Sequence, residues 1–183
     1  MPNPDLEQIH SDQPSGPTLR CITINLNAFM LAIPIDRIER VIKQTQVLGS
    51  GLNHVGLAHY EGVPITVVDL HHKLFHTPQV INPQEGYLII ANTTSQNKFA
   101  FPIQKFPNLI EFSTGELRVL PSSYRSADTL SIASHVVRVV QSSGENITFF
   151  ILDMDYLANQ YNKDKFQPVF DAAGNPQVPA TYR

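Results

Sequence analysis

Hydrophobic and polar residues alternate along much of the chain with the period of two that β-strands show when one face is buried. The clearest case is formed by Ile22, Ile24 and Leu26, which alternate with polar residues. A second apolar run follows at residues 29–33, so the two runs predict a β-hairpin. Further strands are predicted at residues 40–42, 55–59, 65–68, 87–91, 99–103, 109–112, 135–141 and 147–152.

Two short helices are predicted among these strands. One follows Asp69 and runs through Phe75, and the other follows Asp153 and runs through Tyr161. An aspartate at an N-cap accepts a hydrogen bond from the first free amides of a helix, so capping explains both residues. Short strands separated by Gly, Pro, Ser and Asn turns are typical of small barrels or a sandwich. The pattern therefore predicts a mainly β fold with short helices.

The sequence contains an internal repeat. Residues 32–38 (AIPIDRI) recur 68 positions later as residues 100–106 (AFPIQKF), with three identical residues in seven. Residues 65–70 (ITVVDL) are matched in the same way by residues 147–154 (ITFFILDM). A repeated order of strand, acid and helix predicts two similar β lobes.

The two ends of the chain differ from its centre. Residues 1–18 contain four prolines and show no apolar periodicity, so we expect a flexible N-terminal arm. Residues 161–183 turn polar again and form a C-terminal tail, in which Phe166, Val169 and Phe170 could dock on the body. The folded domain is expected at residues 19–160.

Charge and composition exclude several classes of protein. The chain has 183 residues, with 13 Lys and Arg against 16 Asp and Glu and no run of like charges, which argues against nucleic acid or anionic lipid as a partner. The single cysteine, Cys21, cannot form an internal disulfide. The first residues lack the features of a signal peptide, and the apolar runs fall far short of the ~20 residues that span a bilayer. We therefore expect a cytoplasmic protein without membrane insertion.

Four motifs occur in order along the chain. They are residues 32–42 (AIPIDRIERVI), 56–70 (GLAHYEGVPITVVDL), 99–109 and 151–157, and the most specific pattern is Gly56-x5-Gly62-x-Pro64-x4-Asp69-Leu70. Together these motifs resemble the CheW-like domain of bacterial chemosensory adaptors, the first two its first half and the last two its second half. The resemblance covers about residues 20–160.

This resemblance implies a fold of two intertwined five-stranded SH3-like β-barrel lobes, formed around residues 28–85 and 86–150. It also implies a monomeric, non-enzymatic adaptor without a cofactor. Such adaptors couple the cytoplasmic tip of a methyl-accepting chemoreceptor to the regulatory domain of a CheA-type histidine kinase. The output is chemotaxis, phototaxis or pilus motility.

The resemblance also implies two sets of binding residues. The kinase-binding positions correspond to Ile38, Arg40 and Gly56, and the receptor-binding positions to His59, Tyr60, Glu61 and Tyr87. Where the family usually carries Asn-Leu-Arg-Gly, this chain has glutamate in place of the arginine, at Glu61. Reversing a charge changes the choice of partner. The departure predicts either a different receptor or a scaffold that no longer couples receptors.

Two other kinds of chemistry were weighed against this interpretation. Asp69, His72 and His76 suggest a metal site, since His72 and His76 lie on one face of a helix. The run lacks both an HExxH glutamate and paired cysteines, so exposed helix histidines are favoured. Asp69 and Asp153 suggest an acid/base pair, but capping explains both, and Cys21 is expected to be a small buried thiol. The sequence therefore predicts no metal site and no catalytic residue.

Overall fold

The structure is a computed structural model that describes residues 16–26, 30–49, 54–82, 84–125, 130–141, 143–161 and 172–173. Most of the predicted arm and most of the predicted tail, including Phe166, Val169 and Phe170, lie outside the described residues. In the part of the chain that is described, none of the helices has the length and hydrophobicity needed to cross a bilayer.

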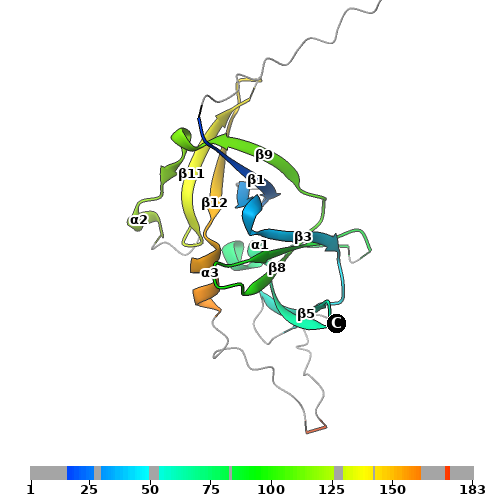
Figure 1. Cartoon of the computed structure of the whole chain (residues 1–183). Helices are drawn as coiled ribbons and strands as arrows, with labels where there is room; N and C mark the ends of the chain where they lie inside the picture. Colours follow the sequence, from blue (N-terminus) through cyan, green and yellow to red (C-terminus); the bar gives the residue numbers. More distant parts are fainter. Residues whose placement is uncertain are drawn as a thin grey trace, which may run out of the picture.

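The described chain is mainly β, as predicted (Figure 1). Its strands are β1 (Thr18–Asn25), β2 (Met30–Pro34), β3 (Ile38–Lys43), β4 (Leu48–Gly49), β5 (Val55–Tyr60), β6 (Val63–Val68), β7 (Tyr87–Asn92), β8 (Lys98–Ile103), β9 (Asn108–Ser113), β10 (Arg118–Val119), β11 (Ala133–Val140) and β12 (Asn146–Leu152). The helices are α1 (Leu70–Phe75), α2 (Ser122–Arg125) and α3 (Met154–Gln160), with two 3-10 turns, η1 (Ile35–Arg37) and η2 (Thr114–Glu116). Each predicted strand is found, whereas β4, β10 and α2 were not predicted because two to four residues are too few to show a period.

The strands form two six-stranded sheets with the same architecture. One sheet, called lobe 1, has the order β4-β5-β6-β8-β7-β3, and the other, called lobe 2, has the order β10-β11-β12-β2-β1-β9. In each sheet the central pair is parallel, β6 with β8 and β2 with β12, and the other pairs are antiparallel. The internal repeat seen in the sequence is therefore a repeat of topology.

The two halves of the chain exchange hairpins. The β1–β2 hairpin begins the first half but pairs with β9 and β12 of the second half. The β7–β8 hairpin begins the second half and pairs with β3 and β6 of the first half. The two lobes are therefore intertwined, as expected, and each sheet consists of six strands. Alternation along a strand predicts which side chains face inward, but the choice of partner strand depends on contacts that are distant in sequence.

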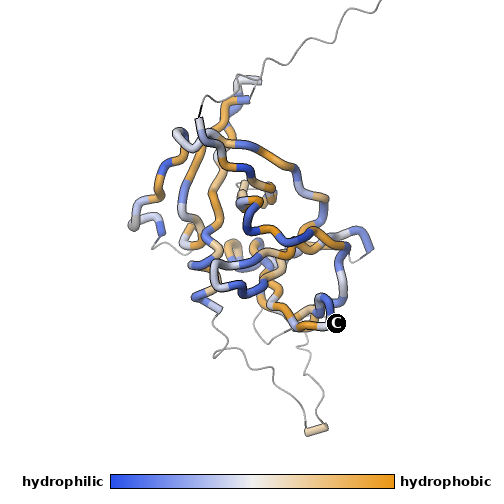
Figure 2. The backbone as a smooth tube through the Cα atoms, in the orientation of Figure 1, coloured by the Kyte–Doolittle hydropathy of each residue, from blue (hydrophilic) through white to orange (hydrophobic). Residues whose placement is uncertain are grey.

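Among the described residues, three hydrophobic cores follow from this arrangement. Lobe 1 encloses one core around Leu88 and Ile90, and lobe 2 encloses another around Cys21 and Phe112. The largest core lies between the lobes and takes residues from both sheets and from α1 and α3, among them Leu31, Phe101 and Leu157. Figure 2 shows the hydrophobic residues concentrated on the strands, with hydrophilic residues at most turns.

The capping prediction is confirmed in both lobes. The Asp69 carboxylate accepts a hydrogen bond from the amide of His72 at 2.9 Å, and the Asp153 carboxylate accepts one from the amide of Tyr156 at 2.9 Å. The backbone amides of the two aspartates also donate to equivalent carbonyls, those of His54 and Ile132. Both carboxylates therefore have a structural role, because they satisfy helix amides that would otherwise lack a partner.

Replacing Leu157 with alanine is expected to destabilise both lobes together. Leu157 is fully buried in the core between the lobes, and Leu→Ala changes at such sites cost about 2–5 kcal/mol. Urea denaturation should show one transition, shifted to lower denaturant, because each lobe depends on the same core. Leu109→Ala is the matched control, since Leu109 is 54% exposed and its truncation should change stability by less than about 0.5 kcal/mol. Two separate transitions would contradict the shared core.

The thiol of Cys21 is expected to be unreactive in the folded protein. Burial, and secondly the charge of Asp36, raise its pKa to about 12, whereas an unfolded thiol has a pKa of about 8.5. The thiolate is the reactive form, so Ellman's reagent at pH 8 should react slowly with the native protein and rapidly in urea. Above pH ~8.5 the unfolded thiol loses its proton while the folded thiol keeps it. The contribution of Cys21 to the free energy of unfolding is therefore complete below pH ~8.5 and declines as the pH rises towards 12. Equal reaction rates with and without urea would refute the burial.

Candidate binding surfaces

The tip of the β5–β6 hairpin holds Glu61 in a fixed position. Tyr60 and Val63 are the last paired residues, which leaves Glu61 and Gly62 as a two-residue turn. Both have positive φ, 52° and 78° respectively, as the tight turns of hairpins require. A glycine adopts this conformation freely, whereas glutamate does so rarely. The turn presents the Glu61 side chain to solvent.

An ion pair joins this turn to the edge strand β3. Nη1 of Arg40 lies 3.8 Å from Oε1 of Glu61, and both side chains are more than half exposed. The two strands stand far apart in the order of the sheet, so the sheet of lobe 1 must curl to bring them together. Such an exposed pair contributes little to stability. The ion pair nevertheless places Arg40, an expected kinase-binding residue, and Glu61, an expected receptor-binding residue, on one surface.

A second polar group lies next to this pair. Nζ of Lys98 lies 2.7 Å from Oε1 of Glu39, and Asn92 donates to the other carboxylate oxygen at 3.2 Å. The hydrogen bond from Lys98 is the main cause that lowers the pKa of Glu39, and the same bond raises the pKa of Lys98. We call the exposed residues Glu39, Arg40, His59 and Glu61, together with the half-buried Lys98, the hairpin surface. Its positive and negative charges are in balance.

Tyr60 belongs to the core of lobe 1 and not to its exterior. Only 7% of the residue is exposed, and it packs with Ile65, Leu88 and Ile90. Burial raises the pKa of its hydroxyl. His59, the preceding residue, points outward opposite Pro64. Tyr60 therefore offers little surface to a partner, whereas His59 is accessible.

The kinase-side residues Ile38 and Gly56 differ in accessibility. Ile38 begins β3, is partly buried and packs against the core between the lobes. Gly56 is buried at the position where β4 pairs with β5. A Cβ atom on Gly56 would lie 2.5 Å from Cγ1 of Val47 and 2.8 Å from the carbonyl oxygen of Leu48. The absent side chain at Gly56 therefore allows β4 to approach β5.

Tyr87 lies at the other end of the β3–β7 pair, away from the hairpin surface. Nζ of Lys43 donates to its hydroxyl at 3.0 Å, and the ring of Phe106 packs edge-on against its ring at a centroid distance of 5.3 Å. Phe106 is 62% exposed. It borders a groove of about 470 Å³ between the lobes, together with residues of β1 and β2 such as Ile24 and Met30. Tyr87 is therefore separated from Glu61 and associated with this inter-lobe groove.

The histidines near α1 have structural partners. Nδ1 of His71 lies 2.7 Å from the carbonyl oxygen of Thr77, and His76 ends the helix in a left-handed conformation. Both carboxylate oxygens of Asp69 accept backbone amides, those of His72 and Gln79. Burial is the main cause that lowers the pKa of His54. Within the described residues, no group of three or more His, Cys, Asp and Glu side chains could hold a metal ion.

Comparisons with known proteins agree with this architecture. The family model of the CheW-like domain matches residues 20–161, which include both lobes. A similar solved structure is the scaffolding protein TtCheW from Thermoanaerobacter tengcongensis, with a TM-score of 0.62 and 13% sequence identity. The match covers 94% of this chain and 98% of that chain, and at this identity it establishes the fold alone. A comparison with curated proteins finds no match.

Replacing Gly56 with alanine is expected to destabilise lobe 1. The new Cβ atom would overlap Val47 and the backbone of Leu48, and overpacking of this kind costs about 1–3 kcal/mol. Gly115→Ala is a matched control, because a Cβ atom there would meet Oγ of Ser113 at an ordinary distance of 3.7 Å. Urea denaturation of the two variants measures the difference. If both variants had the stability of the wild type, β4 would not pack as described.

Proposed function

Since the chain belongs to the family of CheW-like domains, we propose that it is a non-enzymatic adaptor in a chemosensory system. In this proposal the protein acts in the cytoplasm as a monomer and binds both a CheA-type histidine kinase and a chemoreceptor. The observation that carries the proposal is the presence of two separate surfaces, the hairpin surface and the inter-lobe groove, on lobes joined by one core. Such a body can hold two partners in a fixed relation.

We assign the kinase regulatory domain to the hairpin surface. Ile38 offers a partly exposed apolar side chain, and Arg40 and Glu61 lie at the same end of lobe 1. An apolar contact with charged groups around it is typical of specific protein interfaces. Gly56 supports this surface indirectly by keeping β4 against β5.

We assign the receptor tip to the inter-lobe groove beside Tyr87. The exposed ring of Phe106 provides an aromatic anchor, a residue type that contributes strongly to binding. Lys43, which donates to Tyr87, and Lys105, which borders the groove, add positive charge. His59 and Glu61, although the family resemblance implies a receptor role, lie on the hairpin surface.

A second candidate function is a scaffold that no longer couples receptors, and the Arg40–Glu61 pair favours it. In this chain the acid at position 61 meets Arg40 with opposite charge. The arginine usual in the family would face Arg40 with like charge and would give the surface a net positive charge. A partner that recognises the usual charge is disfavoured here by electrostatics.

Calorimetry with the kinase regulatory domain from the same source tests the adaptor function. Wild-type protein should bind, and Ile38→Asp and Arg40→Glu should each weaken binding about tenfold or more. Val140→Asp is the matched control, since Val140 is 67% exposed on lobe 2. The double variant Arg40→Glu, Glu61→Arg keeps the internal ion pair with its two charges exchanged. Its binding should remain weakened if the kinase domain recognises the individual charges. Absence of wild-type binding would overturn the adaptor function.

The same assay with the receptor tip separates the two candidates. Phe106→Ala should weaken receptor binding and leave kinase binding unchanged, because Phe106 is remote from the hairpin surface. Kinase binding without any receptor binding would favour the receptor-independent scaffold. Gly56→Arg is unsuitable as a probe of either interface, because the side chain would disrupt the packing of β4.

A further inference from the structure

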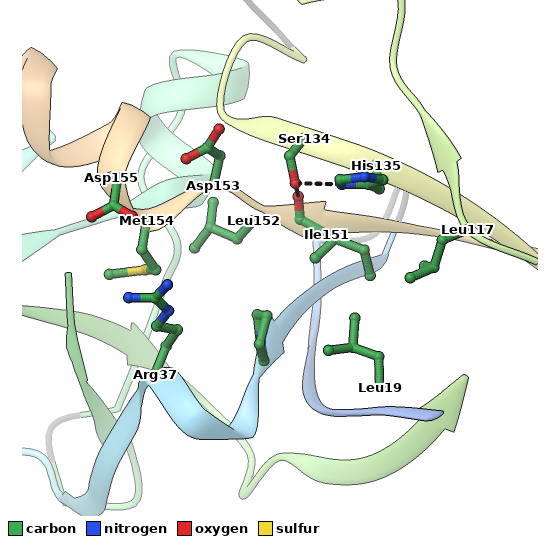
Figure 3. Close-up of a pocket in the computed structure, with 11 residues that line it drawn as sticks. Leu19, Arg37, Leu117, Ser134, His135, Ile151, Leu152, Asp153, Met154 and Asp155 are labelled. Atoms are coloured by element: carbon green, nitrogen blue, oxygen red, sulfur yellow. Dashed lines mark hydrogen bonds between the residues drawn. The ribbon is translucent and has the colours of Figure 1, made fainter. Parts of the chain in front are cut away.

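Lobe 2 contains a cavity that the proposed partners do not use. Its volume of about 310 Å³ lies at the lower end of the range of about 300–1,000 Å³ for small-molecule sites. Figure 3 shows Leu19, Leu117 and Ile151 pointing into the same space, and together with Pro34 they form an apolar wall. The size and the lining therefore suit a small molecule with an apolar side chain.

Two charged residues reach the rim of this cavity because the central strands of lobe 2 are parallel. β2 and β12 pair with Ala32 opposite Ile151, so both strands end on the same side of the sheet. Arg37 follows β2 at the end of η1, and Asp155 follows β12 in α3. Both residues line the cavity, and Figure 3 shows the Arg37 side chain extending towards Met154 and Asp155. The topology thus brings one cation and one anion, the two rim residues, to the same opening.

The Arg37 guanidinium has unused hydrogen-bond donors. Among the described residues its only ion pair is with Asp36, whose Oδ2 lies 3.9 Å from Nε of Arg37 and whose side chain is largely exposed. An exposed pair at this distance contributes little to stability. A guanidinium offers five N–H donors in a planar fork that matches a carboxylate. The partly buried Arg37 can therefore bind a carboxylate at the cavity.

Asp155 is ionised and has one carboxylate oxygen available. The amide and the hydroxyl of Thr94 both donate to Oδ1, the amide at 2.8 Å, whereas Oδ2 accepts no hydrogen bond from the described residues. Hydrogen bonding from the Thr94 hydroxyl is the main cause that lowers the pKa of Asp155, and the charge of Arg37 lowers it further. The two rim residues thus attract each other without a direct ion pair. A positively charged group of a ligand can contact Oδ2.

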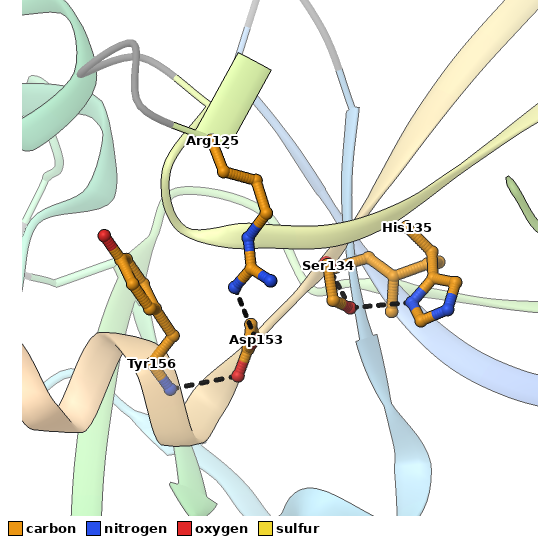
Figure 4. A network of polar contacts seen from close by, with 6 residues as sticks. Arg125, Ser134, His135, Asp153 and Tyr156 are labelled. Atoms are coloured by element: carbon orange, nitrogen blue, oxygen red, sulfur yellow. Dashed lines mark hydrogen bonds and ion pairs between the residues drawn. The ribbon is translucent and has the colours of Figure 1, made fainter. Parts of the chain in front are cut away.

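The other ionisable side chains in the described lining of the cavity have partners. The Asp153 carboxylate accepts hydrogen bonds from the amide of Tyr156 at 2.9 Å and from Nη2 of Arg125 at 2.8 Å (Figure 4). Nδ1 of His135 lies 2.9 Å from Oγ of Ser134. The two rim residues are therefore the charged groups of this lining that have unused hydrogen-bonding capacity.

We propose that this cavity binds an apolar α-amino acid, with its carboxylate on Arg37, its ammonium on Asp155 and its side chain against the apolar wall. A free amino acid carries both charges at neutral pH, one on each side of a single carbon atom, so it satisfies both rim residues at once. A simple carboxylate would leave Asp155 without a cation, and a simple amine would leave Arg37 without an anion. Charge-assisted hydrogen bonds at both ends are stronger than neutral ones.

Lobe 1 lacks the equivalent pair of charges. The two N-cap aspartates align α1 with α3 and place His71 at the position of Asp155. The ring of His71 contacts the carbonyl oxygen of Thr77 at 2.7 Å. In the internal repeat Lys105 takes the position of Arg37, and it borders the inter-lobe groove. Binding is therefore expected in lobe 2 alone, and lobe 1 provides an internal reference.

Methyl NMR of the full chain during a titration with leucine tests the proposal. The signals of Leu117 and Ile151 should shift and saturate, with a dissociation constant of about 1 mM or tighter, as expected for a ligand of this size. The signals of Ile65 and Val67 in the core of lobe 1 should stay unchanged and also report that the protein is folded. Absence of saturable shifts in lobe 2, or equal shifts in both lobes, would overturn the proposal.

Analogues of leucine test each charge on the wild-type protein. Isocaproate lacks the ammonium and isopentylamine lacks the carboxylate, so each should bind at least about tenfold more weakly than leucine. Glycine keeps both charges and should also bind more weakly, because it has no side chain to contact the apolar wall. If isocaproate or isopentylamine bound as tightly as leucine, the cavity would be a site for simple anions or cations, and the assignment to an amino acid would be wrong.

Two variants test the rim residues. Arg37→Gln and Asp155→Asn should each weaken leucine binding at least about tenfold, and the amide oxygen of Asp155→Asn can still accept from Thr94. Arg118→Gln is the matched control, since Arg118 is exposed on β10 and donates to the carbonyl of Gly115 at 2.9 Å. Unchanged leucine binding in either rim variant, with the lobe 1 signals in place, would refute the assigned contacts.

Discussion

Side chains from both halves of the chain meet in one hydrophobic core between the lobes, and the rest of the structure depends on that contact. Leu31 comes from the hairpin of the first half, Phe101 from the hairpin of the second, and Leu157 from α3. A polar contact supports the core, because the amide of Thr94 in lobe 1 donates to the carboxylate of Asp155 at 2.8 Å, and hydrogen bonding from Thr94 lowers the pKa of Asp155. The two candidate binding surfaces are held in a constant relation by this contact.

The parts of the fold that were predicted from sequence are those determined by local chemistry. Ile22, Ile24 and Leu26 alternate because all three side chains face the core between the lobes, and this alternation is visible in the sequence itself. Asp69 and Asp153 were predicted as caps because the amides that they accept lie only three residues away. The parallel pairing of β2 with β12 was not predictable in this way, since Leu31 and Phe150 are paired across most of the chain.

In the candidate sites, too, the features that depend on contacts distant in sequence could not be predicted. The turn at Glu61 was visible from Gly62 and Pro64, but its ion pair with Arg40 requires the curl of the sheet. Gly56 was identified by family resemblance, and the physical need for glycine there arises from β4, a strand too short to be predicted. The exposure of Phe106 was not predicted, because in the repeat this residue matches Ile38 and appears as one more apolar position. Exposure depends on neighbouring strands and not on the residue's own segment.

The exchange of hairpins has a consequence for how the protein is made. Lobe 1 lacks its central parallel partner until β8 has left the ribosome, and the β1–β2 hairpin waits for β12, more than 100 residues later. Contacts between residues so distant in sequence are slow to form, because loop closure is entropically costly. Until then the edge of β2 that will receive β12 is open to strands of other chains. Synthesis of β12 is therefore the step that ends this exposure of the nascent chain to misassembly.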